Sequence, residues 1–400
     1  MISKLLSNDV QSFLTDHYLS DPQQLLLKYR TISGLPASII VDQLTGRRKA
    51  EERLPTWHSN KNIIYPPAVN LEQSSSEKSA LVKVDLLESH MGDLRGKILL
   101  DLTGGFGVDS YFFSKAFKHV HVVEPNGELL QITRHNHREL DSHNISYYNM
   151  SAESFLKSSP LKSADVIFLD PSRRIIGDKK VYSLSESLPS VVALQPALLE
   201  LSANLLIKTS PLLDIQVGLN ELEFVKHVYI TSVNNDCKEV LFFSERNFKS
   251  EPTITAININ DMDENFSFRL SEERTAENQY SDPLDFIYEP NASLLKSGAF
   301  KILGAAFNLH KLHPNTHLYT SQTFNNHFPG RVFQIETIAR PNEKLTELFE
   351  GGKVNIFTRN YPLTVDAIRK KYRLKDGGEK YLIACTGIKK KFLLIAKRVR

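Results

Sequence analysis

The chain has 400 residues, of which 41% are hydrophobic and 24% charged, with a formal net charge of +3. This composition excludes a disordered chain, a coiled coil and a collagen-like fibre, and the length predicts several domains of ~100–200 residues. Two cysteines exclude a disulfide framework, and no apolar run reaches the ~18–20 residues of a membrane span, so we expect a cytoplasmic protein without a membrane segment.

Residues 1–92 are predicted to be helical. Asp21 followed by Pro22 is a typical helix start, because the acidic residue caps the helix and proline suits its first position. Trp57 is the only tryptophan in the chain. We expect it to pack in the core of this helical layer, where a large aromatic side chain buries the most surface.

Between residues 93 and 250 short apolar runs alternate with helical stretches. The predicted strands are residues 97–102, 119–124, 165–170 and 205–208, and the predicted helices are 108–117, 126–140 and 189–203. Alternation of this length predicts βαβ units and a parallel sheet. Residues 225–232 and 239–243 are separated by a turn cluster, so we expect them to form an antiparallel pair that ends the sheet.

The last 150 residues are predicted to be rich in strands. Strands are expected at 253–258, 266–270, 333–338, 354–359, 381–386 and 392–398, with helices at 294–303, 343–349 and 364–371. Residues 340–400 carry 16 Lys and Arg but only six Asp and Glu. Such a basic segment indicates either a polyanion partner or a solvated basic surface.

A glycine-containing loop follows the first predicted strand and opens a helix. It runs from Asp101 through Thr103, Gly105 and Gly107 to Asp109. A nicotinamide-binding loop would need a third glycine where this chain has serine. The acidic start instead resembles the loop of class I S-adenosylmethionine (SAM) methyltransferases, since a carboxylate suits the cationic groups of SAM and would repel a pyrophosphate.

Two further strand ends fit the same cofactor. Glu124 ends the next strand, where a carboxylate can accept hydrogen bonds from both ribose hydroxyls of an adenosine. Ser151 follows the third strand, where members of the resembled family commonly carry an Asp or Ser beside the adenine.

The fourth strand ends in Asp170-Pro171-Ser172-Arg173-Arg174. This segment resembles the [DN]-P-P-[YFW] motif of enzymes that methylate amines. An exocyclic amine on a base is a weak nucleophile, so a carboxylate and a backbone carbonyl must hold and aim it. Ser172 and Arg173 replace the second proline and the aromatic residue, and Arg173 or Arg174 could stack on a base or hold a phosphate instead.

Several segments together resemble bacterial methyltransferases that carry a C-terminal THUMP-like domain. These are residues 71–77, 170–174, 208–211 and 289–293. The resemblance implies an α/β fold with a seven-stranded Rossmann-like class I methyltransferase sheet. It implies a helical region at 1–92, a methyltransferase domain at 93–250, a ferredoxin-like domain at 251–330 and a THUMP-like domain at 331–400. It also implies that Gln73, Ser74 and Ser75 close over the methionine end of SAM.

We therefore expect a SAM-dependent methyltransferase that acts on an exocyclic amine of an RNA base. The expected RNA contacts are Arg173, Arg174, Lys370, Lys371, Lys389, Lys390 and Lys391. Two alternatives stay open: a protein or small molecule as substrate, or a SAM-sensing RNA-binding protein that no longer catalyses. We expect no metal site, because Pro314 interrupts the helix that would align His310, His313 and His317.

Overall fold

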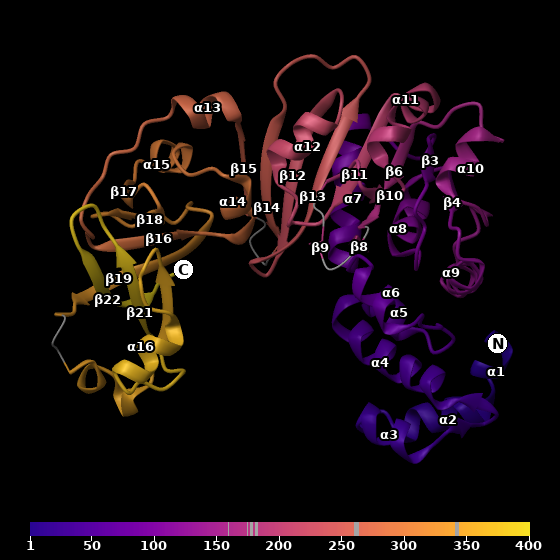
Figure 1. Ribbon diagram of the computed structural model, residues 1–400, viewed down its shortest axis with the longest axis horizontal. Helices are drawn as coiled ribbons and strands as arrows, with labels where there is room; N and C mark the ends of the chain where they lie inside the picture. Colours follow the sequence, from indigo (N-terminus) through magenta and orange to yellow (C-terminus); the bar gives the residue numbers. More distant parts are fainter. Residues whose placement is uncertain (159, 174, 177–178, 181–182, 260–263, 341–343) are drawn as a thin grey trace. The chain divides into compact units, whose positions relative to one another are not determined.

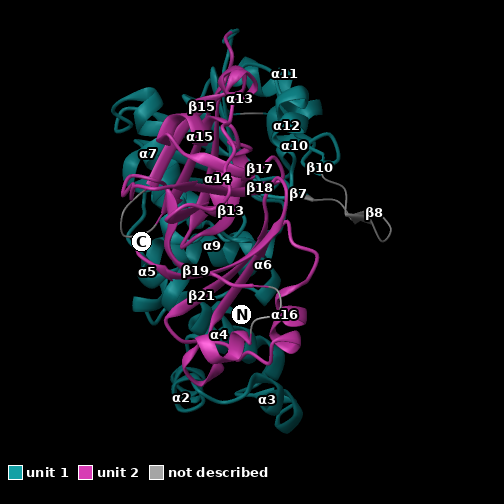
Figure 2. Ribbon diagram, turned by 90° about the vertical axis from the view of Figure 1, so that its left-hand side faces the viewer, with its two compact units in different colours: residues 1–226, 240–249 teal, residues 227–239, 250–400 magenta. Residues whose placement is uncertain are grey.

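The computed structural model describes the whole chain except residues 159, 174, 177–178, 181–182, 260–263 and 341–343 (Figure 1). The chain separates into two compact units. Unit 1 contains residues 1–226 and 240–249, and unit 2 contains residues 227–239 and 250–400 (Figure 2). The division passes through the hairpin formed by β12 (Val225–Val233) and β13 (Asp236–Glu245). It is coarser than the four expected domains, whose limits stay a prediction.

The N-terminal part of unit 1 is helical, as predicted. Its helices are α1 (Ile2–Leu5), α2 (Asn8–Asp16), α3 (Pro22–Lys28), α4 (Ala37–Arg53), α5 (Pro55–Ser59), α6 (Ala68–Gln73) and α7 (Glu77–Met91), with a short pair β1 (Thr31–Ile32) and β2 (Leu35–Pro36). Asp21 caps α3 by accepting the Gln23 N–H at 2.8 Å. Trp57 is fully buried and its ring centroid lies 4.7 Å from that of Tyr111, which confirms its place in the core.

The rest of unit 1 is built on a parallel sheet. Its parallel strands are β3 (Ile98–Asp101), β4 (His119–Val123), β5 (Ile145–Tyr148), β6 (Val166–Leu169) and β11 (Asn204–Thr209). The helices between and after them are α8 (Val108–Ala116), α9 (Gly127–Glu139), α10 (Ala152–Lys157), α11 (Val191–Leu201) and α12 (Ile215–Glu221). The apolar residues of β3 and β6 are buried almost throughout, as expected for strands covered on both faces.

The strand order confirms the expected class I arrangement of seven strands, which form part of a nine-stranded sheet. The full order is β15-β14-β12-β13-β11-β6-β3-β4-β5, in which the seven strands from β12 to β5 are the expected set and β13 runs antiparallel to β11. Four short strands follow β6 along the chain: β7 (Ser172–Arg173), β8 (Ile175–Ile176), β9 (Lys179–Lys180) and β10 (Ser187–Leu188). The β12–β13 hairpin turns at Asn234 and Asn235, whose φ angles of 51° and 64° suit a tight turn.

The prediction that this hairpin ends the sheet is wrong. Within unit 2, β14 (Thr253–Ile259) pairs in parallel with β12, and β15 (Glu264–Arg269) pairs antiparallel with β14. The outer edge of β12 carries backbone N–H and C=O groups that need partners, and β14 supplies them. Sequence periodicity identified both strands but could not show which edge they join.

A second sheet forms most of unit 2, with the strand order β17-β18-β16-β19-β22-β21-β20. Its strands are β16 (Phe286–Pro290), β17 (His310–His313), β18 (Thr316–Ser321), β19 (Gly330–Ile338), β20 (Asn355–Arg359), β21 (Lys380–Thr386) and β22 (Lys391–Arg398). The helices of this unit are α13 (Leu270–Thr275), α14 (Ala292–Ser297), α15 (Ile302–Phe307) and α16 (Val365–Lys371), with 3₁₀ turns η1 (Leu345–Leu348) and η2 (Glu350–Gly352).

Two helix predictions in unit 2 need correction. The helix expected at 294–303 is two helices, because α14 ends at Gly298, whose φ of 80° is the left-handed conformation that terminates a helix. The helix expected at 343–349 is the 3₁₀ turn η1 over its described part. Its run of four residues is too short to specify an α-helix without a cap, and Lys344 provides no side-chain cap.

Candidate active site

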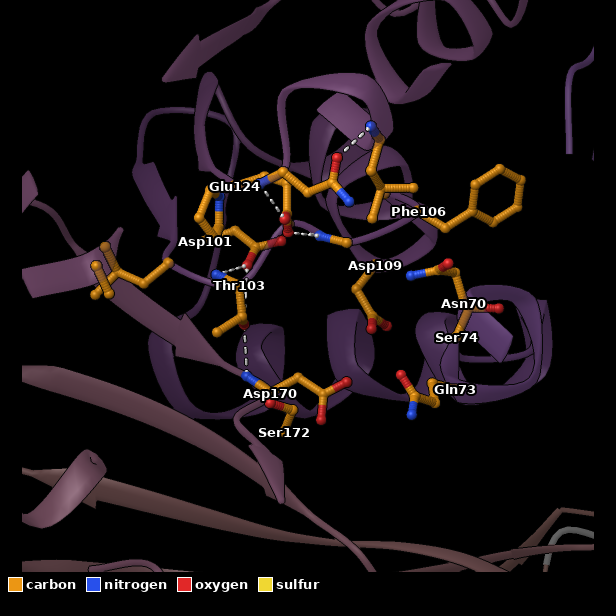
Figure 3. Close-up of a pocket in the computed structure, with 18 of the residues that line it drawn as sticks. Asn70, Gln73, Ser74, Asp101, Thr103, Phe106, Asp109, Glu124, Asp170 and Ser172 are labelled. Atoms are coloured by element: carbon orange, nitrogen blue, oxygen red, sulfur yellow. Dashed lines mark hydrogen bonds between the residues drawn. The ribbon is translucent and has the colours of Figure 1, made fainter. Parts of the chain in front are cut away.

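A cavity of about 460 Å³ lies at the carboxyl ends of β3, β4 and β6 in unit 1 (Figure 3). This is the edge at which open parallel sheets bind their ligands. The predicted residues that line it are Gln73, Ser74, Ser75, Asp101, Thr103, Gly105, Gly107, Asp109, Glu124, Ser151, Asp170 and Ser172. The fold therefore brings segments that are about 100 residues apart in the sequence to one site.

The glycine loop is held open by its own backbone conformation. Gly105 and Gly107 have φ angles of 52° and 81°, which side chains other than glycine rarely adopt. A Cβ at Gly107 would lie only 2.4 Å from Thr133 Cγ2. From α9, Thr133 donates a hydrogen bond to the Gly105 carbonyl at 2.8 Å and His137 Nε2 lies 2.7 Å from the Gly107 carbonyl oxygen. These contacts fix the loop against α9 and leave the face at Gly105 clear.

Glu124 lies beside the glycine loop and is 8% exposed. Its two carboxylate oxygens accept the Gly105 N–H at 2.9 Å and the Asn126 N–H at 2.8 Å (Figure 3). Each carboxylate oxygen has two lone pairs, so Glu124 can accept further donors from the cavity side. The structure thus gives this residue a role in holding the loop, in addition to the ribose contact predicted for it.

Asp101 is buried behind the loop, with 1% of its surface exposed. One carboxylate oxygen accepts the Thr103 N–H at 2.9 Å and the other accepts the Ser110 hydroxyl. Burial raises the pKa of Asp101 to about 7, and the nearby carboxylates of Asp109 and Asp170 act in the same direction. Its direct contribution is therefore to fix the loop, and its charge depends on pH near neutrality.

Asp170 is the most accessible of the acidic residues at the ends of these strands. Its backbone N–H donates to Thr103 Oγ1 at 2.7 Å, which ties the end of β6 to the glycine loop. Its side chain is 30% exposed and forms an ion pair with Lys208. Figure 3 shows its carboxylate pointing into the cavity, opposite the side chain of Gln73.

A buried polar network beneath the cavity contains two lysines that the sequence analysis missed. Lys83 of α7 lies 3.1 Å from Asp109 Oδ1, and Ser75 donates to Asp109 Oδ2 at 2.7 Å. Burial by itself would raise the pKa of Asp109, but the charges of Lys83 and Lys208 hold it below its ordinary value. Asp109 therefore anchors the segment at Ser75 to the start of α8.

A feature of the sequence could have identified each of these two lysines. Lys83 lies on the same helix face as Ala80 and Leu87, which are apolar and buried. A charged residue on an apolar face needs a buried partner. Lys208 lies near the carboxyl end of a buried strand, the edge where ligand sites form.

The remaining predicted residues are placed as follows. Ser74 donates to the Leu71 carbonyl at 2.7 Å, and Ser151 caps α10 by accepting the Ser154 N–H at 3.2 Å. Ser172 is exposed and donates to the Leu188 carbonyl at 3.2 Å. Pro171 is half-buried beside it.

The predicted nucleic-acid contacts are not among the residues that line the cavity. The backbone of Arg173 belongs to β7, and Arg174 lies outside the described residues. The predicted lysines of unit 2 are all exposed; these are Lys370, Lys371, Lys389, Lys390 and Lys391. One of them, Lys390, pairs with Asp282 at 3.2 Å.

Within the described ranges, no group of three or more His, Cys, Asp or Glu side chains is arranged to hold a metal ion. His310 and His313 lie in β17, whereas His317 lies in β18 and its ring stacks on Phe300. Among the helices that the structure describes, none is both long and apolar enough to cross a membrane.

Comparison with known proteins gives matches to domain families and to solved structures. Residues 286–329 match a ferredoxin-like domain and residues 330–398 match a THUMP domain-like family. A crystal structure from Porphyromonas gingivalis W83, described as a "putative methyltransferase", superimposes with a TM-score of 0.84 at 27% identity and covers 98% of both chains. No curated protein matches the sequence.

A more distant match is an rRNA methylase from Streptococcus thermophilus, with a TM-score of 0.31 and 16% identity over 42% of this chain and 95% of that one. The strand order and the match over the whole chain establish the class I methyltransferase fold, followed by ferredoxin-like and THUMP-like domains.

Proposed function

We propose that this protein is a SAM-dependent methyltransferase whose cofactor binds in the cavity of unit 1. The observation that carries the proposal is that one cavity unites the glycine loop, Glu124 and Asp170, each at the end of a different parallel strand. The likeness of the whole chain to the Porphyromonas protein supports the same conclusion.

The residues present fit SAM. Glu124 lines the cavity beside the loop and would accept the ribose hydroxyls, while Leu129, Pro125 and Ala152 would give an apolar surface for the adenine ring. Gln73 and Ser74 offer polar groups from the segment after α6 for the methionine end. The open face at Gly105 leaves room for close approach to the backbone, because the nearest atom to a Cβ there would be 3.8 Å away. When bound, SAM supplies an electrophilic methyl group.

The acceptor is proposed to be an exocyclic amine. Asp170 accepts an N–H of the amine through its carboxylate, and Pro171 accepts through its backbone carbonyl. These two contacts would hold the nitrogen in one orientation and localise its lone pair, which is otherwise delocalised into the ring. Since the amine becomes acidic as it is methylated, the site requires no strong general base.

RNA is the proposed carrier of that amine. The THUMP-like segment at residues 330–398 contains most of the basic excess of the last 61 residues, and its predicted contact lysines are exposed. Exposed lysines and arginines are the side chains that bind phosphate backbones without sequence preference.

Two measurements test the proposal. Isothermal calorimetry of the full chain with SAM should show binding at one site, and absence of binding would reject the cofactor assignment. Mass spectrometry of nucleosides from RNA of cells with and without the gene should show loss of one N-methylated nucleoside. If SAM binds but no nucleoside changes, the acceptor is a protein or small molecule, or the chain senses SAM without catalysis.

A further inference from the structure

Lys208 connects the proposed acceptor site to the buried network behind it. Its Nζ forms an ion pair with Asp170 Oδ2 and lies 3.3 Å from Ser75 Oγ. Ser75 Oγ also accepts from Lys83 Nζ at 3.2 Å and donates to Asp109. One ammonium group at the end of β11 therefore contacts both the carboxylate at the end of β6 and the segment between α6 and α7.

The two ends of this pair differ in accessibility. The Lys208 side chain is 11% exposed, and Lys208 is not among the residues that line the cavity, whereas the Asp170 side chain is 30% exposed and lines it. An acceptor in the cavity would therefore meet Asp170, with Lys208 behind it. Any effect of Lys208 on the acceptor must pass through Asp170.

The charges around Asp170 show what the lysine contributes. Asp101 from β3 faces Asp170, and Asp109 from α8 lies close to Asp101. Lys83 from α7 pairs with Asp109, while Lys208 from β11 is the cation paired with Asp170. Thr103 contributes a neutral hydroxyl on the same side. Without Lys208, the Asp170 carboxylate would lose its ion-pair partner in a partly buried site and would be free to rotate.

We propose that Lys208 is a positioning residue that holds the Asp170 carboxylate in one orientation for the acceptor amine. The inference rests on the proposed function of the cavity. By binding Oδ2, Lys208 fixes the plane of the carboxylate, and the remaining lone pairs stay available to an N–H donor. Its contact with Ser75 couples this orientation to the segment that carries Gln73 and Ser74.

The direct test follows the orientation of the Asp170 carboxylate and needs no substrate. Crystal structures of the full-length wild type and its variants give the side-chain torsion angles of Asp170. In Lys208→Met the orientation of the carboxylate should differ from that in the wild type, since its ion-pair partner is removed. In Lys208→Arg it should stay close to that of the wild type.

Lys83→Met is the matched control. It removes another buried lysine of the same network, but one that pairs with Asp109. The Asp170 carboxylate should keep its wild-type orientation in this variant. Equal reorientation in the two variants, or none in Lys208→Met, would overturn the proposal. Should Lys208→Met fail to fold, Lys208→Gln replaces it, with the same expected direction.

The consequence for activity is a separate readout. With labelled SAM and RNA from cells that lack the gene, Lys208→Met should lower kcat at least about tenfold, because the carboxylate that aims the acceptor amine is no longer held in place. Its affinity for SAM should stay within about threefold of the wild type, and Lys208→Arg should recover part of kcat. Equal loss of kcat and SAM affinity would indicate a structural role. Failure of the wild type to bind SAM would reject the proposed function, whereas the crystal structures of the variants decide on Lys208 independently.

Discussion

The charged groups at the cavity of unit 1 differ in burial from those of the THUMP-like segment in unit 2. Beneath the cavity, Lys83 is completely buried and pairs with Asp109. In the THUMP-like segment, Lys390 has a side chain that is 62% exposed and pairs with an exposed Asp282. Breaking a buried pair costs ~3–5 kcal/mol, whereas an exposed pair contributes ~0–1 kcal/mol.

This difference matches two kinds of task. A reaction needs groups fixed to within a fraction of an ångström, and buried pairs with several hydrogen bonds provide that precision. Binding a polyanion needs many exposed positive charges that remain free to adapt. The comparison therefore predicts that substitutions in the cavity change chemistry and stability, while substitutions in the THUMP-like segment change affinity and its dependence on salt.

The largest expected effect comes from Asp170→Ala, which should lower kcat by at least about 1,000-fold. The reason is that the variant no longer holds the acceptor amine. The affinity for SAM, measured by calorimetry, should stay within about threefold. Asp170→Asn keeps the shape of the side chain without its charge, and its kcat should lie between those of the wild type and Asp170→Ala. Near-normal turnover in the alanine variant would rule out the amine mechanism.

Lys83→Met should lower the free energy of unfolding by ~3–5 kcal/mol, because it leaves the Asp109 carboxylate buried without its ion-pair partner. Denaturant titration measures this change. The matched surface variant, Lys390→Met, should change it by less than ~1 kcal/mol. Similar losses of unfolding free energy in both variants would contradict the difference in ion-pair strength between the two regions.

The stability of unit 1 should depend on Asp101 in a defined pH range. Its folded pKa of about 7 lies above the ordinary value of 3.8, so the folded state retains a proton that the unfolded state releases. Stability should therefore decrease as pH rises from about 4 to about 7 and become constant above that, by a total of a few kcal/mol. Asp101→Asn should lack this decrease in thermal unfolding. Parallel curves of stability against pH for the wild type and Asp101→Asn would show that Asp101 is ionised throughout this pH range.

Glu124→Ala should weaken SAM binding by ~1–3 kcal/mol, the scale of charge-assisted hydrogen bonds that the variant cannot form. Part of this loss would come from the glycine loop, since Glu124 also accepts the Gly105 N–H. Glu128→Ala removes an exposed carboxylate from the first turn of α9, four residues farther along the chain, and should leave the affinity unchanged. Unchanged calorimetric affinity in Glu124→Ala would remove this residue from the ribose contact.

The smallest effect is expected for reversal of Lys389, Lys390 and Lys391 to Glu, which should weaken tRNA binding by about tenfold at low salt. The slope of log affinity against log salt should fall by roughly 0.7–0.9 for each phosphate that the variant no longer binds. The control reverses three exposed lysines of unit 1, Lys4, Lys28 and Lys162. An RNA affinity that is insensitive to salt and to the first set would favour a protein substrate.

Much of the site was predictable because its residues follow local rules. Asp101, Glu124 and Asp170 each end a buried strand, and parallel strands present their carboxyl ends at one edge. Gly107 was predictable because the turn into α8 demands a left-handed backbone. The two corrected helices show the limit of such rules, since a capping glycine or a missing cap outweighed an apolar run.

The sequence by itself determined the parallel sheet, the glycine loop and the acidic strand ends, because periodicity and backbone preference act over a few residues. Only the tertiary structure decided how Ser75, Lys83, Asp109 and Lys208 join in one buried network, since Ser75 and Lys208 are 133 residues apart. Ion pairs and hydrogen bonds between distant segments have no fixed spacing along the chain. They form where the packing of α7, α8 and β11 brings charged groups together. Because an unpaired charge is costly in a buried site, these groups pair with one another.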